Sequence, residues 1–193
     1  MRNLLLSIAL VAFLAAGANA HTGMIALFAD THNHECHTTL GAYQTGSLYL
    51  MYVRGDGPRM GQGYEFKLIK SSPDVAFLEP SWPSNIILTL GALETGISLV
   101  AAECFPNLDY VPLGEIPILN ISESGTFTVT VVPDPIQIPQ HAIVISKCEL
   151  GAPLHVVSGG TFVFNSGCPD PLNPFGALAT KETSWGAIKE LYR

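Results

Sequence analysis

The densest group of side chains able to do chemistry lies at 30–37, which reads Asp-Thr-His-Asn-His-Glu-Cys-His. In an extended chain, Asp30, His32, His34 and Cys36 would share one face, because successive side chains point to opposite sides. Two imidazoles and a carboxylate at this spacing could bind a divalent metal such as zinc, copper or nickel. The opposing interpretation is a plain polar loop, in which Cys36 is oxidised and offers no thiolate.

A second route to metal binding starts at His21. If a leader is cleaved after Ala20, His21 becomes the N-terminal residue and offers both its α-amine and its imidazole. In this respect the chain resembles copper-dependent polysaccharide monooxygenases and periplasmic copper carriers, which are exported sandwich proteins that begin with His. That resemblance implies a copper site, although any residue can follow a cleavage site. The candidate second ligands are His32, His34, His37, His141 and His155.

Other catalytic chemistry has little support. The chain has no Gly-x-Ser-x-Gly motif, and turn chemistry accounts for Ser158-Gly159-Gly160. Glu115 and Glu123 stand on different segments, so nothing pairs them as the two carboxylates of a glycosidase. Trp82 lies between two prolines and is the aromatic residue most expected to be exposed. An exposed ring could act as a platform on which a sugar stacks, and packing in the core is the alternative. The sequence therefore predicts a protein that is not an enzyme and needs no cofactor.

The first 20 residues have the pattern of a secretory leader. Arg2 is followed by an apolar run that ends at Gly17, and Ala18-Asn19-Ala20 fits a small-x-small cleavage site. The run is shorter than the roughly 20 residues that a membrane span needs, and no other stretch is long enough. We therefore expect cleavage near Ala20 and a mature protein without a transmembrane segment. It would be secreted, periplasmic or held at the cell surface, and a retained N-terminal anchor is the alternative.

The mature chain is acidic. Without the leader, 8 basic and 16 acidic residues remain, which gives a net charge of −8 over 173 of the 193 residues. An acidic surface repels phosphate backbones, so nucleic acid is excluded as an expected partner. The 18 Gly and 14 Pro residues suit short strands that are joined by tight turns.

Four cysteines, Cys36, Cys104, Cys148 and Cys168, form an even set. In an exported chain this favours two disulfides, and four cysteines allow three pairings. Their spacing matches no Cys-x-x-Cys zinc or redox motif.

Alternation of apolar and polar residues predicts an all-β fold. The stretch 124–132, with Phe127, Val129 and Val131 facing inward, has the pattern of a half-buried strand and is expected at the centre of a sheet. Pro112 and Pro117 argue against a regular central strand over 111–121. Residues 21–167 are expected to form one antiparallel β-sandwich of Ig-like or jelly-roll-like type. Its other strands are expected at 24–29, 47–53, 63–70, 75–78, 86–90, 96–102, 142–146, 154–157 and 161–164.

The end of the chain departs from this pattern. Residues 168–183 form a linker that contains Pro and Gly, and Ser184 can cap a short helix over 185–192. A helix this short needs a surface to dock on, because its nucleation is costly. Residues 168–193 are therefore predicted to be a linker and an amphipathic helix with a docking or sorting role. The apolar face of that helix would carry Trp185, Ile188, Leu191 and Tyr192.

The order of the strands resembles a cohesin-type sandwich. The segments that carry the resemblance are 25–30, 64–68, 72–75, 96–104 and 126–132. The chain is also similar to a group of exported bacterial sandwich proteins. Its end, Trp185-Gly186 followed by Leu191-Tyr192-Arg193, is similar to the short tail that closes many exported proteins of such bacteria.

This resemblance implies a non-catalytic module, because cohesins bind dockerin modules without catalysis. The expected function is protein or glycan interaction at the cell surface, or a structural role. The alternative is a copper or zinc protein, and even a copper oxidative enzyme, built on His21 and the histidines of 30–37. Proteins of this bacterial group have two cysteines that occur together. One follows the strand that matches 96–102, and the other matches Cys148. This implies a Cys104–Cys148 disulfide and leaves Cys36 and Cys168 for the second bridge.

Overall fold

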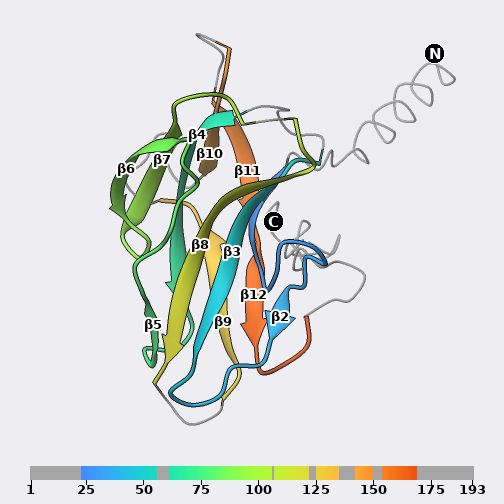
Figure 1. The fold of residues 1–193 in the computed structure, drawn as a ribbon, viewed down its shortest axis with the longest axis vertical. Helices are drawn as coiled ribbons and strands as arrows, with labels where there is room; N and C mark the ends of the chain where they lie inside the picture. The colour runs from blue at the N-terminus through green and yellow to red at the C-terminus, as the bar shows by residue number, and fades with distance from the viewer. Residues whose placement is uncertain are drawn as a thin grey trace, which may run out of the picture.

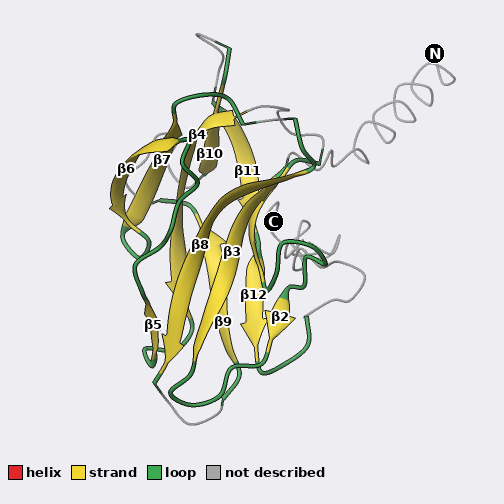
Figure 2. Ribbon diagram, in the orientation of Figure 1, coloured by secondary structure: helices red, strands yellow, loops and turns green. Residues whose placement is uncertain are grey.

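The computed structural model describes residues 23–55, 61–105, 107–121, 125–134, 142–149 and 154–168, and every regular element in these ranges is a β-strand (Figure 2). The all-β fold class is confirmed. Within these ranges, no helix has the length and apolar character that crossing a membrane requires. The leader predicted over 1–20 and the helix predicted over 185–192 lie outside the described residues.

Twelve strands follow one another along the described chain, and most lie where the sequence predicts a strand. They are β1 (Met24–Phe28), β2 (His37–Thr38), β3 (Thr45–Val53), β4 (Gly61–Lys70), β5 (Val75–Phe77), β6 (Ile86–Ala92), β7 (Gly96–Ala101), β8 (Tyr110–Asn120), β9 (Phe127–Val132), β10 (Ile143–Lys147), β11 (His155–Gly159) and β12 (Thr161–Phe164).

The strands pack as two facing layers (Figure 1). In one layer β1, β3, β8 and β5 are neighbours in that order, and each pair is antiparallel. In the other layer β4 is the central strand. Its first half pairs with β7 on one side and with β10 on the other, and its second half pairs with β9. β6 pairs with β7. β11 connects the layers, because it pairs with both β10 and β1. The sequence predicts an antiparallel sandwich, and the β1–β11 and β2–β12 ladders are its parallel exceptions.

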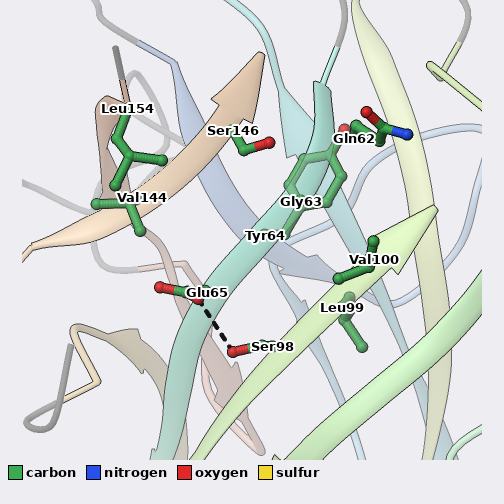
Figure 3. A pocket seen from close by; sticks show the side chains of 10 residues that line it. All are labelled: Gln62, Gly63, Tyr64, Glu65, Ser98, Leu99, Val100, Val144, Ser146 and Leu154. Atoms are coloured by element: carbon green, nitrogen blue, oxygen red, sulfur yellow. Dashed lines mark hydrogen bonds between the residues drawn. The ribbon is translucent and has the colours of Figure 1, made fainter. Parts of the chain in front are cut away.

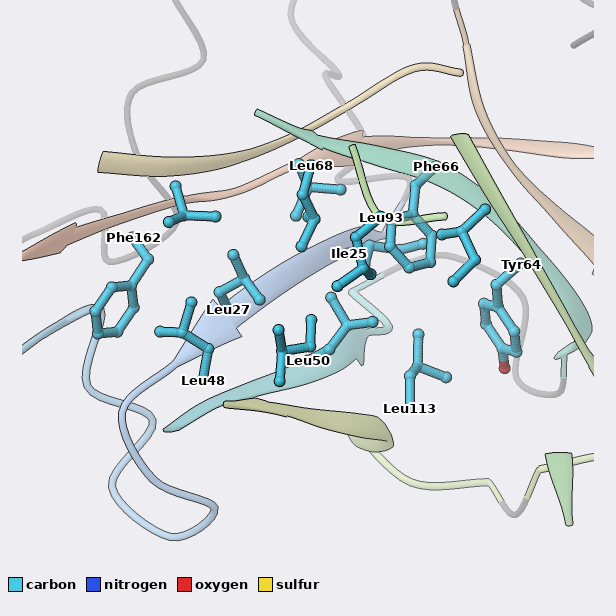
Figure 4. Packing of buried hydrophobic residues seen from close by; sticks show 14 of the residues in the cluster. Ile25, Leu27, Leu48, Leu50, Tyr64, Phe66, Leu68, Leu93, Leu113 and Phe162 are labelled. Carbon is cyan, nitrogen blue, oxygen red and sulfur yellow. The ribbon is translucent and has the colours of Figure 1, made fainter. Parts of the chain in front are cut away.

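The main core lies between the layers, and strict alternation along the strands fills it. From Tyr64 to Leu68 on β4, and along all of β9, every second side chain is buried, and the residues between them are half-buried on the outer face. Figure 4 shows Leu27 and Leu50 from the first layer gathered with Phe66 and Leu68 of β4 in this core. Burying each such side chain contributes about 1.5–3 kcal/mol to folding. The predicted inward-facing strand at 124–132 is β9, and it lies between β4 and β12 as expected for a central strand.

β1 is buried on both faces. Ile25 and Leu27 face the main core, whereas the residues that alternate with them point the other way. These residues build a second apolar cluster, which consists of Met24, Ala26, Phe28 and Met51, with Tyr49, Val53 and Tyr110 packed against it. The unbroken apolar run at 24–29 is therefore the signature of a strand that is covered on both sides.

β8 contradicts one prediction. The sequence predicts no regular central strand over 111–121, yet β8 runs through it between β3 and β5. The Pro117 carbonyl accepts the Leu78 amide at 2.8 Å on the β5 side. Because the N–H and C=O of one residue point the same way in a strand, the nitrogen of Pro117 faces this short edge strand and not β3. Near Pro112 the register shifts, and a proline is tolerated at such a bulge.

Candidate functional site

One row of outward-facing residues crosses five strands, β6-β7-β4-β10-β11. Leu90 lies opposite Ser98, Ser98 opposite Glu65, and Glu65 opposite Val144. Val144 in turn lies opposite Val156. The residues on either side of Glu65 along β4 are buried in the main core, so this row points away from it.

A groove of about 410 Å³ lies along the row (Figure 3). Gly63 belongs to its lining, and a Cβ placed on Gly63 would lie 3.3 Å from the Cβ of Ser146, so the missing side chain leaves room there. Val144 is only 2% exposed, which means that this part of the groove is firmly packed. The lining residues are Gln62, Gly63, Tyr64, Glu65, Ser98, Leu99, Val100, Val144, Ser146 and Leu154.

Glu65 is the one acidic residue among the described lining residues, and the Oγ of Ser98 donates a hydrogen bond to its Oε1 over 3.2 Å (Figure 3). A half-buried carboxylate that accepts one hydroxyl keeps the capacity to accept bonds from an incoming cation or N–H group. No histidine or cysteine lines the described part of the groove, and Glu65 is the one group there that could take a proton from the Ser98 hydroxyl. The free accepting capacity of Glu65 suits the groove to binding a cation or an N–H donor.

The rim of the groove is apolar and exposed. Leu90, Leu154 and Val156 are 55%, 48% and 49% exposed. Over the described part of the chain β6 pairs with β7 alone, so its other edge is open. β6 contains no charged residue and no proline, which are the usual devices that keep an edge strand from pairing. Apolar side chains beside an open edge are typical of a surface that another molecule covers.

Trp82, the predicted sugar platform, lines a different cavity of about 380 Å³. It is half-buried rather than exposed, and it packs against the main core. The reason is Gly114 on β8: a Cβ there would lie 2.4 Å from the Cε3 of Trp82, so the glycine lets the ring lie on the sheet. Sugar stacking at Trp82 stays a prediction. The part of the ring that lies on Gly114 is covered by the sheet.

The histidine-rich segment predicted to bind metal is a turn. The Asp30 carboxylate accepts two main-chain amides of this turn, and these bonds hold the pKa of Asp30 below its ordinary value. His34 has a φ of 56°, and its ring stacks on that of Tyr110. The shared face of Asp30, His32, His34 and Cys36 required an extended chain, and this turn does not provide one. Metal binding by His21, His32, His34 and His37 stays a prediction.

One group of three potential metal ligands comes together among the described residues, and it is Cys36, His37 and Cys168. Neither His32 nor His34 belongs to it. The two cysteines are joined in a disulfide, so the oxidised group offers only its imidazole. Of the other predicted ligands, His155 lies on β11 opposite Ile145, and His21 and His141 lie outside the described residues.

The disulfides are Cys36–Cys168 and Cys104–Cys148, which is the pairing that the resemblance implied. The first joins the turn before β2 to the chain after β12. The second joins the chain after β7 to the chain after β10. Together they fasten distant parts of the sandwich to one another.

Sequence reasoning did not identify the groove. The alternation over 63–70 places Glu65 on an outer face, but nothing local indicates that Ser98 and Val144 flank it. The sequence contains one weak indication of the groove. The stretch 86–90 is uncharged and mostly apolar, as an edge strand that a partner covers would be.

Comparison with known proteins supports the fold. No family model matches the chain, and no curated protein matches its sequence. Among solved structures, the cohesin module of a Clostridium perfringens family 33 glycoside hydrolase is similar, with a TM-score of 0.54 and 6% identity over 75% of this chain and 96% of that module. The third ScaB cohesin of R. flavefaciens, solved in complex with a group 1 dockerin, has a TM-score of 0.50 and 10% identity over 78% and 94%. At these identities the similarity shows a cohesin-like β-sandwich fold.

Proposed function

We propose that this protein is a non-catalytic module that binds a protein partner through the groove around Glu65. The observation that carries the proposal is the groove itself, in which a half-buried carboxylate stands among apolar side chains beside an open strand edge. The fold agrees with this function, because one similar structure is a cohesin in complex with a dockerin.

The chemistry of the groove indicates what the partner presents. Glu65 would accept a charge-assisted hydrogen bond from a lysine, an arginine or an N–H group. Leu90, Leu154 and Val156 would pack against apolar side chains, which gain roughly 25 cal/mol per Å² of apolar surface that they bury. The expected partner surface is therefore a basic residue flanked by aliphatic ones.

A protein suits this groove better than a glycan does. Sugars are bound by stacking on exposed aromatic rings. Among the described lining residues Tyr64 has the one aromatic ring, and that side chain is fully buried in the main core.

We also propose that the protein acts outside the cytoplasm, as a secreted, periplasmic or cell-surface protein cleaved near Ala20. The leader-like first 20 residues support this location, and so do two disulfides, which persist in oxidising compartments. The mass of the protein purified from the cells that make it tests this proposal. An N-terminus at His21 supports it, and an intact Met1 contradicts it.

The binding proposal is tested with two groove variants, Leu154→Asp and Glu65→Lys. Leu108→Asp is the matched control, because Leu108 is 46% exposed, close to the 48% of Leu154, and does not line the groove. The immobilised wild-type chain and the three variants are exposed to the extracellular and surface proteins of the same cells, and to purified dockerin modules as a defined first probe. Retained proteins are identified by mass spectrometry and measured again by calorimetry.

The expected result is a protein that the wild-type chain and Leu108→Asp bind equally. Both groove variants bind it at least about tenfold more weakly, a loss of about 1.4 kcal/mol or more. Glu65→Lys removes the charge-assisted contact, and Leu154→Asp places a charge in an apolar one. A partner that binds all four chains with the same affinity, or a wild-type chain that retains none, would contradict the proposal.

A further inference from the structure

We propose that Cys36, His37 and Cys168 form a redox-gated metal site, in which reduction of the disulfide by a dithiol lets two thiolates and one imidazole bind a single Zn²⁺ ion. The group lies at the β2–β12 edge and shares no lining residue with the groove around Glu65. This inference goes beyond the proposed function and does not depend on it.

The three ligand atoms already converge. The two sulfurs and a ring nitrogen of His37 lie within 4.8 Å of one another, and Nδ1 of His37 is 3.3 Å from Sγ of Cys168. With Zn–S bonds of about 2.3 Å and Zn–N bonds of about 2.0 Å, two ligands of a tetrahedral zinc ion lie roughly 3.5–3.8 Å apart. The nitrogen is therefore nearly in place, and the sulfurs need only separate once their bond is broken.

Main-chain hydrogen bonds hold Cys36 and His37 beside β12 independently of the disulfide. The Cys36 carbonyl accepts the Val163 amide at 3.0 Å, and the Thr38 carbonyl accepts the Asn165 amide at 2.9 Å. Both neighbours of His37 are thus tied to the region of β12. The side chain of Asn165, three residues before Cys168, makes three further hydrogen bonds. Reduction removes one covalent bond and leaves this ladder.

The exchange balances in electrons and protons. The dithiol gives two electrons and two protons to the Cys36–Cys168 bond and is itself oxidised to a disulfide. Zn²⁺ then displaces the two thiol protons, and solvent takes the fourth coordination position. Two sulfurs and one imidazole are a ligand set that zinc accepts and that magnesium and calcium do not. Cys36 is 2% exposed, so one of the ligands is shielded from competing water.

The test uses the chain with Cys104→Ser and Cys148→Ser, which keeps Cys36 and Cys168 as its two thiols. The protein is reduced with a dithiol, freed of it under nitrogen and titrated with Co²⁺, a spectroscopic substitute for Zn²⁺. We expect thiolate-to-cobalt charge-transfer absorption that saturates at one equivalent, disappears on addition of Zn²⁺ and is absent from the oxidised protein. His37→Ala weakens Co²⁺ binding at least about tenfold, whereas His32→Ala, in the same turn but outside the group, leaves it unchanged.

Two outcomes overturn the proposal: a reduced protein that shows no charge-transfer absorption, or a Co²⁺ affinity that is the same in His37→Ala. If the Cys104→Ser/Cys148→Ser chain does not fold, the reduced wild-type protein is compared with Cys36→Ser/Cys168→Ser. Loss of the absorption from the latter supports the site, and its persistence overturns it.

Discussion

The ring of His34 lies nearly parallel to the ring of Tyr110, with 3.7 Å between their centroids and 17° between their planes. Phe28 meets both rings edge-on, and it belongs to the second apolar cluster. The turn that carries His34 therefore folds back over this cluster and covers it. A segment whose residue types suggest metal binding contributes packing here.

Replacing His34 by Ala is expected to lower the free energy of unfolding by about 1–2 kcal/mol. An aromatic pair contributes about 0.5–1.5 kcal/mol, and alanine is less tolerant than histidine of the φ of 56° at this position. Urea unfolding measures the change, and His32→Ala, exposed in the same turn, serves as the control with an effect below about 0.5 kcal/mol. Equal stabilities of the two variants would show that the stack does not stabilise the fold.

Gly114→Ala is expected to destabilise the protein by about 1–3 kcal/mol, the usual cost of overpacking. The added Cβ would lie 2.4 Å from the Cε3 of Trp82, and the ring would have to leave the sheet. Gly125→Ala is the matched control, because no atom of the described residues lies within 4 Å of the Cβ it would add. Urea unfolding and Trp fluorescence report both effects. An unchanged Trp environment in Gly114→Ala would contradict this packing.

Strict alternation made much of the fold predictable. The pattern of Tyr64, Phe66 and Leu68 indicates both the strand and its buried face without any tertiary information. The effect of Pro117 could not be predicted in the same way. It depends on whether the nitrogen faces β3 or the short β5, and no local pattern reveals the register between strands.

The candidate site was the least predictable part, because its geometry comes from pairings between strands that are far apart in the chain. Ser98 meets Glu65 only through the β4–β7 ladder, and Val144 meets it only through β4–β10. The same limit applies to His34, whose partner Tyr110 belongs to β8. The residues alone left three disulfide pairings open, and the resemblance to known sandwich proteins indicated the observed one.

Tyr64→Phe is expected to leave the protein as stable at pH 7 or to stabilise it by up to about 2 kcal/mol. The Tyr64 hydroxyl is fully buried and has no hydrogen-bond partner in the described part of the chain, and burying such a group costs about 1–3 kcal/mol. Tyr43→Phe is the control, because Tyr43 is 74% exposed. Urea unfolding at pH 7 compares the two variants. A loss of more than about 1 kcal/mol in Tyr64→Phe would mean that the hydroxyl is satisfied.

The same tyrosines predict a loss of stability in alkali. Burial raises the pKa of Tyr64 above its ordinary value of 10.0 and raises the pKa of Tyr52 to about 12. A raised folded-state pKa contributes stability that is fully present below pH 10 and is lost as the pH rises above it. Urea unfolding from pH 8 to pH 11 should therefore show a decline that begins near pH 10 and is shallower in Tyr64→Phe. Identical pH profiles would contradict burial of the Tyr64 phenol.

The two disulfides are expected to differ in what they contribute. Cys36–Cys168 spans 132 residues and Cys104–Cys148 spans 44. Closing a longer loop removes more entropy from the unfolded chain, so the chain-entropy relation gives about 5 kcal/mol for the first bridge and about 4 kcal/mol for the second. Urea unfolding of Cys36→Ser/Cys168→Ser and of Cys104→Ser/Cys148→Ser against the wild-type chain measures both contributions.

The urea dependence of unfolding separates the possible causes of these losses. If loop entropy dominates, the Cys36→Ser/Cys168→Ser chain is the less stable by about 1 kcal/mol, and the dependence of its unfolding on urea steepens because its unfolded state expands more. If native contacts around the bridge dominate, the pair containing Cys36, which is 2% exposed, also costs more, but the urea dependence does not steepen. A larger loss in Cys104→Ser/Cys148→Ser would contradict both explanations and would place the main constraint between the chain after β7 and the chain after β10.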